Sequence, residues 1–196
     1  MRISLHGAAG GEVTGSAHLV ETRSANVLVD FGLFQGAGKT ENLNQLPKRE
    51  GVRGLDAVVL THAHLDHTGR LPLLTKVGYK NPVYATPATI DLTKLILRDS
   101  AQLQKADAER ATRRNVRQGK PVVEPLYSQE DVDRIDPLFR SMPYAESFPV
   151  ADGISIRAVE AGHMLGSVSI EMTVDEAGQR KVIVFSGDLG PRGAPL

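Results

Sequence analysis

The chain has 196 residues, of which 41% are hydrophobic, so it can bury one substantial core and should form one domain or most of one. Its 23 basic and 23 acidic side chains give a formal net charge of zero, which excludes recruitment of nucleic acid or a membrane by a global field. The absence of cysteine excludes disulfides, thiolate metal ligands and a cysteine nucleophile. No signal-peptide pattern and no run of about 18 apolar residues occurs, so we expect a cytoplasmic protein without membrane contact.

Four short β-branched runs each end at polar side chains, as strands do when they deliver residues to one edge of a sheet. Three of them end at Asp30, His163 and Asp188, and the other ends at a group of histidines. One such ending means little because turns favour Asp and Gly, but four together predict loops that gather these groups. The runs are residues 26–30, 56–62, 154–163 and 181–188.

Two helices are predicted between the second and third of these runs. Residues 87–119 carry apolar side chains in their first half, before polar residues take over. A second helix should begin at Ser128 as its N-cap, with Glu130 and Asp131 in the first turn, and run to about Phe139. Strands that alternate with helices predict an α/β sandwich.

The segment THAHLDHTGR, residues 61–70, holds His62, His64, Asp66 and His67, and so contains three of the six histidines. Imidazole and carboxylate groups are the usual zinc ligands where thiolates are absent, and a catalytic zinc takes three protein ligands and a water. Four ligands this close in sequence would crowd one tetrahedral ion, so the pattern favours two adjacent ions. The alternative is a polar loop that is merely rich in histidine.

These motifs resemble those of the metallo-β-lactamase fold hydrolases. The resemblance rests on the histidine segment, on His163 in AGHMLGS, on Asp188 in FSGDLG and on Asp30, which matches the first motif of the family. Three further stretches are similar to the β-CASP branch, which contains RNA nucleases such as ribonuclease J and the endonuclease of mRNA 3′-end processing. They are GEVTGS at 11–16, DFGLFQG at 30–36 and GRLP at 69–72. The implied fold is an αββα sandwich, and the similarity covers nearly the whole chain.

The resemblance also implies a dinuclear zinc site and two catalytic carboxylates. Asp30 would orient the site through hydrogen bonds, and Asp66 would orient the attacking hydroxide or accept its proton. Two zinc ions would generate hydroxide from a shared water and neutralise charge on phosphoryl oxygens, so the implied function is a ribonuclease that cleaves RNA phosphodiesters with a metal-activated hydroxide. The implied ligands are His62, His64 and His163 for the first zinc, Asp66 and His67 for the second, and Asp188 as the bridge.

Other parts that the resemblance implies are absent from the sequence. β-CASP nucleases insert a second domain after about this point and return with further strands and late histidines, one of which binds the second zinc. No histidine follows His163, so we expect residues 1–196 to be the N-terminal part of a metallo-β-lactamase domain with a weakened second zinc site. The missing strands would expose a sheet edge, so a missing C-terminal part or a partner chain is expected, and a homo-oligomer is also open. Whether this fragment is active alone stays open.

Two alternatives to a ribonuclease remain open at this point. A fold relative that hydrolyses a small ester or thioester would need a closed apolar pocket, and a catalytically silent scaffold subunit would pair with an active partner.

Three weaker signals remain. Residues 98–120 carry seven basic side chains against three acidic ones, which fits either a phosphate-contacting face or an ordinary solvated helix. GAGKT at 36–40 resembles a P-loop but lacks the first glycine at the required spacing, so a surface loop is favoured. His6 and His18 lie outside the metal pattern and are expected to be structural.

Overall fold

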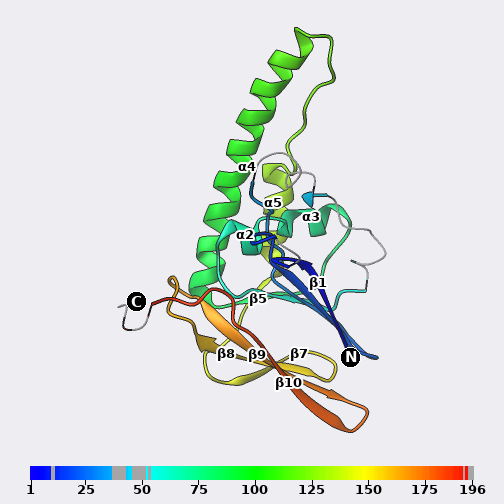
Figure 1. Cartoon of the computed structure of the whole chain (residues 1–196), viewed down its shortest axis with the longest axis vertical. Helices are drawn as coiled ribbons and strands as arrows, with labels where there is room; N and C mark the ends of the chain where they lie inside the picture. The colour runs from blue at the N-terminus through cyan, green and yellow to red at the C-terminus, as the bar shows by residue number, and fades with distance from the viewer. Residues whose placement is uncertain (10–11, 37–42, 46–51, 53, 192, 194–196) are drawn as a thin grey trace.

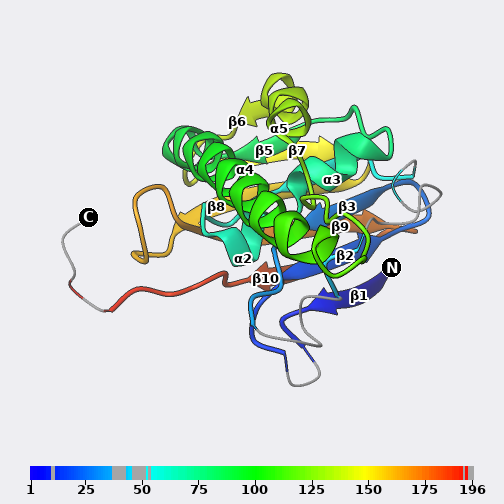
Figure 2. The same cartoon turned by 90° about the horizontal axis from the view of Figure 1, so that it is seen from above.

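The computed structural model describes residues 1–9, 12–36, 43–45, 52, 54–191 and 193. Two sheets pack face to face, and the helices lie on the outer side of the first sheet (Figure 1). Figure 2, seen from above, shows the same arrangement, with the second sheet beneath the first. Apart from Gly36, the P-loop-like segment 36–40 lies outside the described residues.

The first sheet has six strands in the order β1-β2-β3-β4-β5-β6. The first three pair antiparallel, and β3 to β6 run parallel. The parallel strands β3 and β4 are almost entirely Val, Leu and Ala because helices cover one of their faces and the second sheet covers the other. The bounds are β1 (Arg2–Gly7), β2 (Ala17–Glu21), β3 (Asn26–Val29), β4 (Ala57–Val59), β5 (Val83–Ala85) and β6 (Phe139–Ser141).

The second sheet is antiparallel and has the strand order β10-β9-β8-β7. Along β9 the residues alternate between buried apolar and more exposed polar side chains, which is the pattern of a sheet with one face in a core. In the described part of the chain no helix covers the other face, so three layers are present: helices, first sheet, second sheet. The strands are β7 (Ser147–Ala151), β8 (Ile154–Glu160), β9 (Val168–Glu176) and β10 (Gln179–Phe185).

The strand runs predicted from sequence are confirmed. Each predicted run contains an observed strand, and each strand stops one to three residues before the polar side chain at the end of its run. The polar side chains therefore lie on loops at strand ends, outside the sheet hydrogen bonds, where they are free to approach one another.

The helices are α2 (Leu65–Thr68), α3 (Leu71–Lys76), α4 (Pro87–Val116) and α5 (Gln129–Ile135), followed by the 3-10 turn η2 (Asp136–Leu138). Helix α5 begins as predicted, because Ser128 and Asp131 form a reciprocal capping box. The predicted end at about Phe139 is wrong: Pro137 cannot continue a helix interior, and Phe139 instead begins β6. None of the described helices is long and apolar enough to cross a membrane.

Helix α4 starts beside the second sheet and extends well beyond the body of the molecule (Figure 1). Its first turn is fixed by the hydroxyls of Thr86 and Thr89, which donate to the carbonyl of Gly166 at 2.8 and 2.9 Å. Only one stripe of α4 reaches the core, so Leu97 is fully buried whereas Leu95 is 65% exposed.

Leu97 and Leu95 form a matched pair for measuring how much the packing of α4 contributes to the free energy of unfolding. We expect Leu97→Ala to lower the free energy of unfolding by about 2–5 kcal/mol, because it leaves a cavity in the core between the helices and the first sheet. Leu95→Ala should change it by no more than about 0.5 kcal/mol, since that side chain is mostly in solvent. Urea denaturation measures both, and equal losses would contradict the described packing of α4.

Candidate metal centre

Four side chains from distant parts of the chain converge at one edge of the two sheets. The Nδ1 atom of His64 lies 3.1 Å from Nε2 of His62 and 3.1 Å from Nε2 of His163. The Oδ2 atom of Asp188 lies 3.8 Å from Nε2 of His62 and 3.5 Å from Nε2 of His163. The four ligand atoms all lie within 4.8 Å of one another. The structure thus brings together residues up to 126 positions apart, from His62 to Asp188.

This donor set fits a single tetrahedral cation. Zinc–nitrogen bonds of 2.0–2.1 Å place neighbouring ligand nitrogens about 3.3 Å apart, close to the 3.1 Å separations seen here. Hydrogen bonds alone cannot satisfy the cluster, because the single Nδ1 atom of His64 faces two other ring nitrogens. A cation would satisfy all three imidazoles at once.

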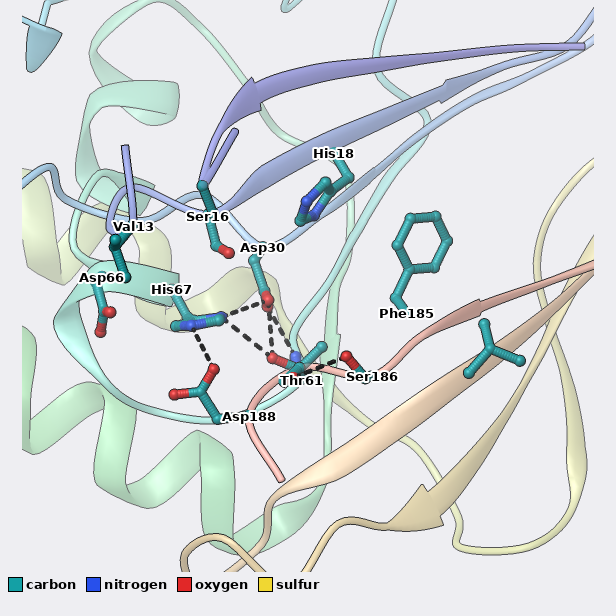
Figure 3. A pocket seen from close by; sticks show the side chains of 13 residues that line it. Val13, Ser16, His18, Asp30, Thr61, Asp66, His67, Phe185, Ser186 and Asp188 are labelled. Atoms are coloured by element: carbon teal, nitrogen blue, oxygen red, sulfur yellow. Dashed lines mark hydrogen bonds and ion pairs between the residues drawn. The ribbon is translucent and has the colours of Figure 1, made fainter. Parts of the chain in front are cut away.

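The second predicted group lies on the other side of Asp188. Its Oδ1 atom lies 3.4 Å from Nε2 of His67 (Figure 3). Because Oδ2 faces His62 and His163, the two carboxylate oxygens face two different sets of ligands, as in a bridging carboxylate. Asp66 borders the same hollow of about 370 Å³ as His67 and Asp188. Among the described side chains, Asp66 and His67 do not belong to the group of ligand atoms within 4.8 Å of one another. The second group is therefore looser than the first.

The carboxylate of Asp30 fixes the cluster from behind. Asp30 is 1% exposed and follows β3 with a left-handed backbone (φ 58°), a conformation that Asp tolerates better than most residues. Its oxygens accept hydrogen bonds from the backbone N–H of Thr61 at 2.8 Å, from the hydroxyl of Thr61 at 2.8 Å and from Nδ1 of His67 at 2.7 Å. Figure 3 shows these contacts.

The same network sets the tautomers of two histidines. The single hydroxyl hydrogen of Thr61 is donated to Asp30, so Nδ1 of His62, 3.0 Å from that oxygen, must be the donor to Thr61. Likewise Nδ1 of His67 donates to Asp30. In the neutral form of each ring, Nε2 therefore carries the lone pair and faces Asp188, which is the arrangement that metal binding requires.

The backbone around Gly32 holds the two motifs in contact. The N–H of Phe31 donates to the carbonyl of His67 at 2.8 Å, and the N–H of Ser16 donates to the carbonyl of Asp66 at 2.8 Å. A Cβ atom on Gly32 would lie 1.5 Å from the carbonyl oxygen of Asp66, so only glycine permits this approach. The glycine in the DFG stretch is thus explained by close packing of the loop after β3 against α2.

Arg70 joins the glycine loops beneath the site. Its buried guanidinium donates to the carbonyls of Gly32 and Gly15 and lies 4.4 and 4.6 Å from the ring centres of Phe31 and Phe34. Burial lowers the pKa of Arg70 to about 10, so it remains charged at neutral pH. No carboxylate neutralises it among the described residues, and carbonyls and aromatic faces take that place.

Two supporting residues were not singled out from sequence. Thr61 directly precedes His62 at the end of the second strand run, and this position was the available signal for its supporting role. Ser167 accepts hydrogen bonds from the backbone N–H groups of His163 and Met164 at 3.0 and 3.1 Å and so shapes that loop; its place at the end of the AGHMLGS motif was the available signal. His18, predicted to be structural, borders the hollow, and its Nδ1 atom is buried without a hydrogen-bond partner among the described residues.

The electrostatics of the two neighbouring rings differ. Burial, followed by the nearby rings of His67, His64 and His163, lowers the pKa of His62 to about 2, so His62 is neutral at working pH. Burial by itself would lower the pKa of His67, but the hydrogen bond and charge of Asp30, together with two further aspartates, outweigh it and raise that pKa. A neutral His62 is available as a ligand without first losing a proton.

The fold and the site together define a protein with a candidate metal centre, in which loops at the edge of two packed sheets gather histidines and aspartates. Residues 10–195 match the family described as the metallo-beta-lactamase superfamily, and the chain belongs to that superfamily. This confirms the fold class and the superfamily resemblance inferred from the motifs.

Curated relatives extend the comparison. The chain is 39% identical over 192 residues to the protein named Ribonuclease TTHA0252 of Thermus thermophilus, covering 98% of this chain and 38% of the relative. It is 34% identical over 181 residues to Transcription termination factor FttA of Cenarchaeum symbiosum, covering 91% of this chain and 26% of the relative. The resemblance to the RNA-nuclease branch is thereby confirmed, and the chain spans well under half the length of these relatives.

A solved structure supports the fold. The metallo-β-lactamase SMB-1, crystallised with mercaptoacetic acid, aligns with a TM-score of 0.53 at 18% identity, over 89% of this chain and 58% of that one. At this identity the likeness concerns the architecture alone.

The role of Asp30 can be tested without catalysis. Asp30→Asn keeps the size of the side chain and tolerates the left-handed backbone, but it removes the charge that holds Nδ1 of His67. We expect zinc affinity to fall by about 10–100-fold, as measured by competition with a chromophoric chelator. Asp56→Asn, at another strand end where Asp56 accepts only from the backbone of Asn26, is the control and should keep wild-type affinity. The same affinity in both variants would contradict the role of Asp30.

The neutral state of His62 predicts a pH dependence of the metal-free protein. The pKa of His62 is lowered in the folded state, so the unfolded chain takes up a proton below about pH 6.5 while the native chain does not. The free energy of unfolding should therefore fall as pH drops below 6.5, by up to about 1.4 kcal/mol per pH unit. Urea denaturation with a chelator present, for the wild type and His62→Gln, isolates this contribution.

The raised pKa of His67 acts with the opposite sign, because its contribution is present at low pH and is lost as pH rises through the folded pKa. The wild type and His62→Gln share the contribution of His67 to first order, so it cancels when their stabilities are compared. The free energy of unfolding of the wild type relative to His62→Gln should therefore decrease from pH 6.5 to pH 5. Parallel pH curves for the two proteins would refute the buried neutral state of His62.

Proposed function

We propose that the chain carries the metal centre of a zinc-dependent, β-CASP-like ribonuclease that hydrolyses RNA phosphodiesters. The observation that carries the proposal is the convergence of three imidazoles with Asp188, whose second oxygen faces His67. The names of the curated relatives, a ribonuclease and a transcription termination factor, support RNA as the substrate.

We assign the metal ligands on the geometry of the cluster. When bound, two zinc ions would lower the pKa of a shared water and offset the negative charge that builds on phosphoryl oxygens. The first zinc would be held by His62, His64 and His163, the second by Asp66 and His67, and Asp188 would bridge them.

The two carboxylates that we regard as catalytic have different tasks. Asp66 is half-buried at the border of the hollow, where its carboxylate can orient the attacking water or hydroxide and accept a proton from it. Asp30 lies behind the ligands and keeps His67 and Thr61 in place through its three hydrogen bonds. Asp66 therefore meets the reacting atoms, and Asp30 acts through the residues it holds.

The surroundings of the cluster favour a phosphodiester over a small apolar ester. The hollow is bordered by Asp30, Asp66, His67 and Asp188 as well as by apolar side chains such as Val13 and Phe185, so it is not the apolar pocket that a small-ester hydrolase needs. The complete first ligand set argues against a silent scaffold, since a protein without metal chemistry has no reason to pack three imidazoles and a carboxylate around one point.

We further propose that residues 1–196 form the N-terminal part of a metallo-β-lactamase domain and that a C-terminal part or a partner chain, a second copy included, completes the site. In support, the chain spans 38% and 26% of the two relatives, and the second ligand group is looser than the first. Val182 and Val184 are exposed on the edge strand β10, which borders the hollow. On this proposal the second zinc binds more weakly, and the cysteine-free chain works in the cytoplasm.

The nuclease proposal is tested with labelled single-stranded RNA and a chimera in which this chain replaces the matching segment of the Thermus ribonuclease. We expect zinc-dependent cleavage by the chimera, and loss of at least about 100-fold with His64→Ala, because His64 lies between the two other imidazoles. Zinc content measured on the isolated chain should show one tightly held ion that His64→Ala removes.

His6→Ala is the matched control, since His6 is an exposed histidine outside the cluster, and it should keep both zinc and activity. Near-zero zinc in carefully purified wild-type chain would favour the silent scaffold. Zinc binding together with hydrolysis of a thioester but not of RNA would favour the small-ester alternative.

A further inference from the structure

The far half of α4 carries a stripe of arginines that the metal centre does not use. Arg110, Arg113, Arg114 and Arg117 recur at positions i, i+3, i+4 and i+7, which places them on one face of the helix, and all four are exposed. Residues 110–120 contain five basic and no acidic side chains, although the whole chain has no net charge. We refer to these four residues as the arginine stripe.

Most of the stripe has no partner within the molecule. Arg110 pairs with Asp107, one turn earlier on the helix. Within the part of the chain that the structure describes, no ion pair involves Arg113, Arg114 or Arg117. The four arginines and Gln118 instead surround a hollow of about 450 Å³. Like charges one turn apart repel, but cations near the C-terminal end of a helix interact favourably with its dipole, so the stripe has little net effect on stability.

The end of the helix is held in place on its other faces. The hydroxyl of Thr112 donates to the carbonyl of Val123 at 3.1 Å and accepts from its N–H at 2.8 Å, while the side-chain amide of Asn115 donates to the carbonyl of Pro121 at 3.0 Å. The returning segment thus packs beside the helix and leaves the stripe uncovered. The guanidinium groups therefore project from a fixed support, which lowers the entropy lost when they bind a ligand.

The stripe is separate from the metal centre. The first turn of α4 is bonded to Gly166, in the loop that carries His163, and the helix then runs outward (Figure 1). At 1.5 Å per residue, Arg113 lies about 39 Å along the helix from Pro87. A ligand on the stripe would therefore not touch the metal ligands.

We propose that the arginine stripe is an accessory site for the phosphodiester backbone of RNA, an inference that rests on the proposed ribonuclease function. Guanidinium groups bind phosphate through paired hydrogen bonds, and the stripe spans about 10 Å along the helix, enough for about two or three successive backbone phosphates. The border of the hollow is only arginine and glutamine, without the apolar pocket in which a protein partner would anchor a side chain. Backbone contacts need no such pocket, and they position RNA without reading its sequence.

The test measures binding of the full chain to a fluorescein-labelled 20-nucleotide single-stranded RNA by anisotropy, in EDTA and over a series of salt concentrations. The triple variant Arg113→Gln/Arg114→Gln/Arg117→Gln should bind at least about tenfold more weakly at 50 mM salt. The slope of log affinity against log salt should become shallower by about 2, so that the wild type loses roughly 20-fold more affinity than the variant between 50 and 200 mM.

The matched control removes the same charge elsewhere, at exposed cations away from the stripe, with Arg23→Gln/Lys80→Gln/Lys181→Gln. It should keep the affinity and slope of the wild type. All the substituted side chains are exposed, so both triple variants should melt at the wild-type temperature. Equal losses in the two variants, or none in the stripe variant, would overturn the proposal. Unchanged RNA binding with loss of binding to poly-glutamate would assign the stripe to an acidic protein instead.

Failure of this inference can be told apart from failure of the nuclease proposal. Binding is measured in EDTA, and His64→Ala should bind RNA as tightly as the wild type, because the stripe does not depend on the metal centre. Stripe-dependent binding by the chain, without zinc-dependent RNA cleavage by the chimera, would refute the nuclease and retain the RNA site. Cleavage with stripe-independent binding would refute the site and retain the nuclease.

Discussion

The burial of one carboxylate, that of Asp30, is the constraint on which the metal centre depends. A charge with almost no exposure is tolerated only when hydrogen bonds replace its lost hydration, and here every donor comes from Thr61 or His67. Parallel pairing of β3 with β4, in which Val29 lies opposite Val59, sets the ends of the two strands side by side and so makes those donors available. The β3–β4 register, the buried charge of Asp30 and the tautomers of His62 and His67 therefore depend on one another. None of these three features can change without changing the others.

The second sheet completes this arrangement. The N–H of Val168, at the start of β9, donates to the carbonyl of Thr61 at 2.9 Å, so the loop carrying His163 is anchored to the residue that contacts Asp30. The cluster thus joins both sheets, and its three imidazoles face one another with ring nitrogens that hydrogen bonds within the protein do not all satisfy. A cation removes this conflict, and binding energy at such a site contributes directly to the stability of the folded state. Metal affinity and packing of the two sheets are for this reason expected to depend on each other.

Local signals predicted much of this fold, and the parts that sequence could not predict depend on contacts between distant residues. The β-branched runs marked their strands because burial on both faces demands apolar side chains, and Ser128 marked its helix because a capping box spans only three residues. The apolar side chains of α4 could not be sorted into buried Leu97 and exposed Leu95, because the helix extends past its core. The meeting of His64 with His163, 99 residues later, followed from family resemblance, since no spacing rule reaches that far. The part played by Thr61 depends on sheet register and was likewise beyond local patterns.

The looser second group of candidate ligands and the open edge strand β10 lie next to each other. The group around Asp66 and His67 has fewer converging ligand atoms than the first, and the hollow beside it is bordered by Val184 and by the segment that follows β10. That strand is also one of the two edges of the second sheet in the described part of the chain, and it presents exposed valines. The outer face of the neighbouring strands β8 and β9 is polar and carries ion pairs such as Arg157 with Glu171. A strand added to β10 would satisfy its open backbone groups and would at the same time pass the hollow beside Asp66 and His67. On the function proposed above, one added strand would therefore complete both the sheet and the second metal site.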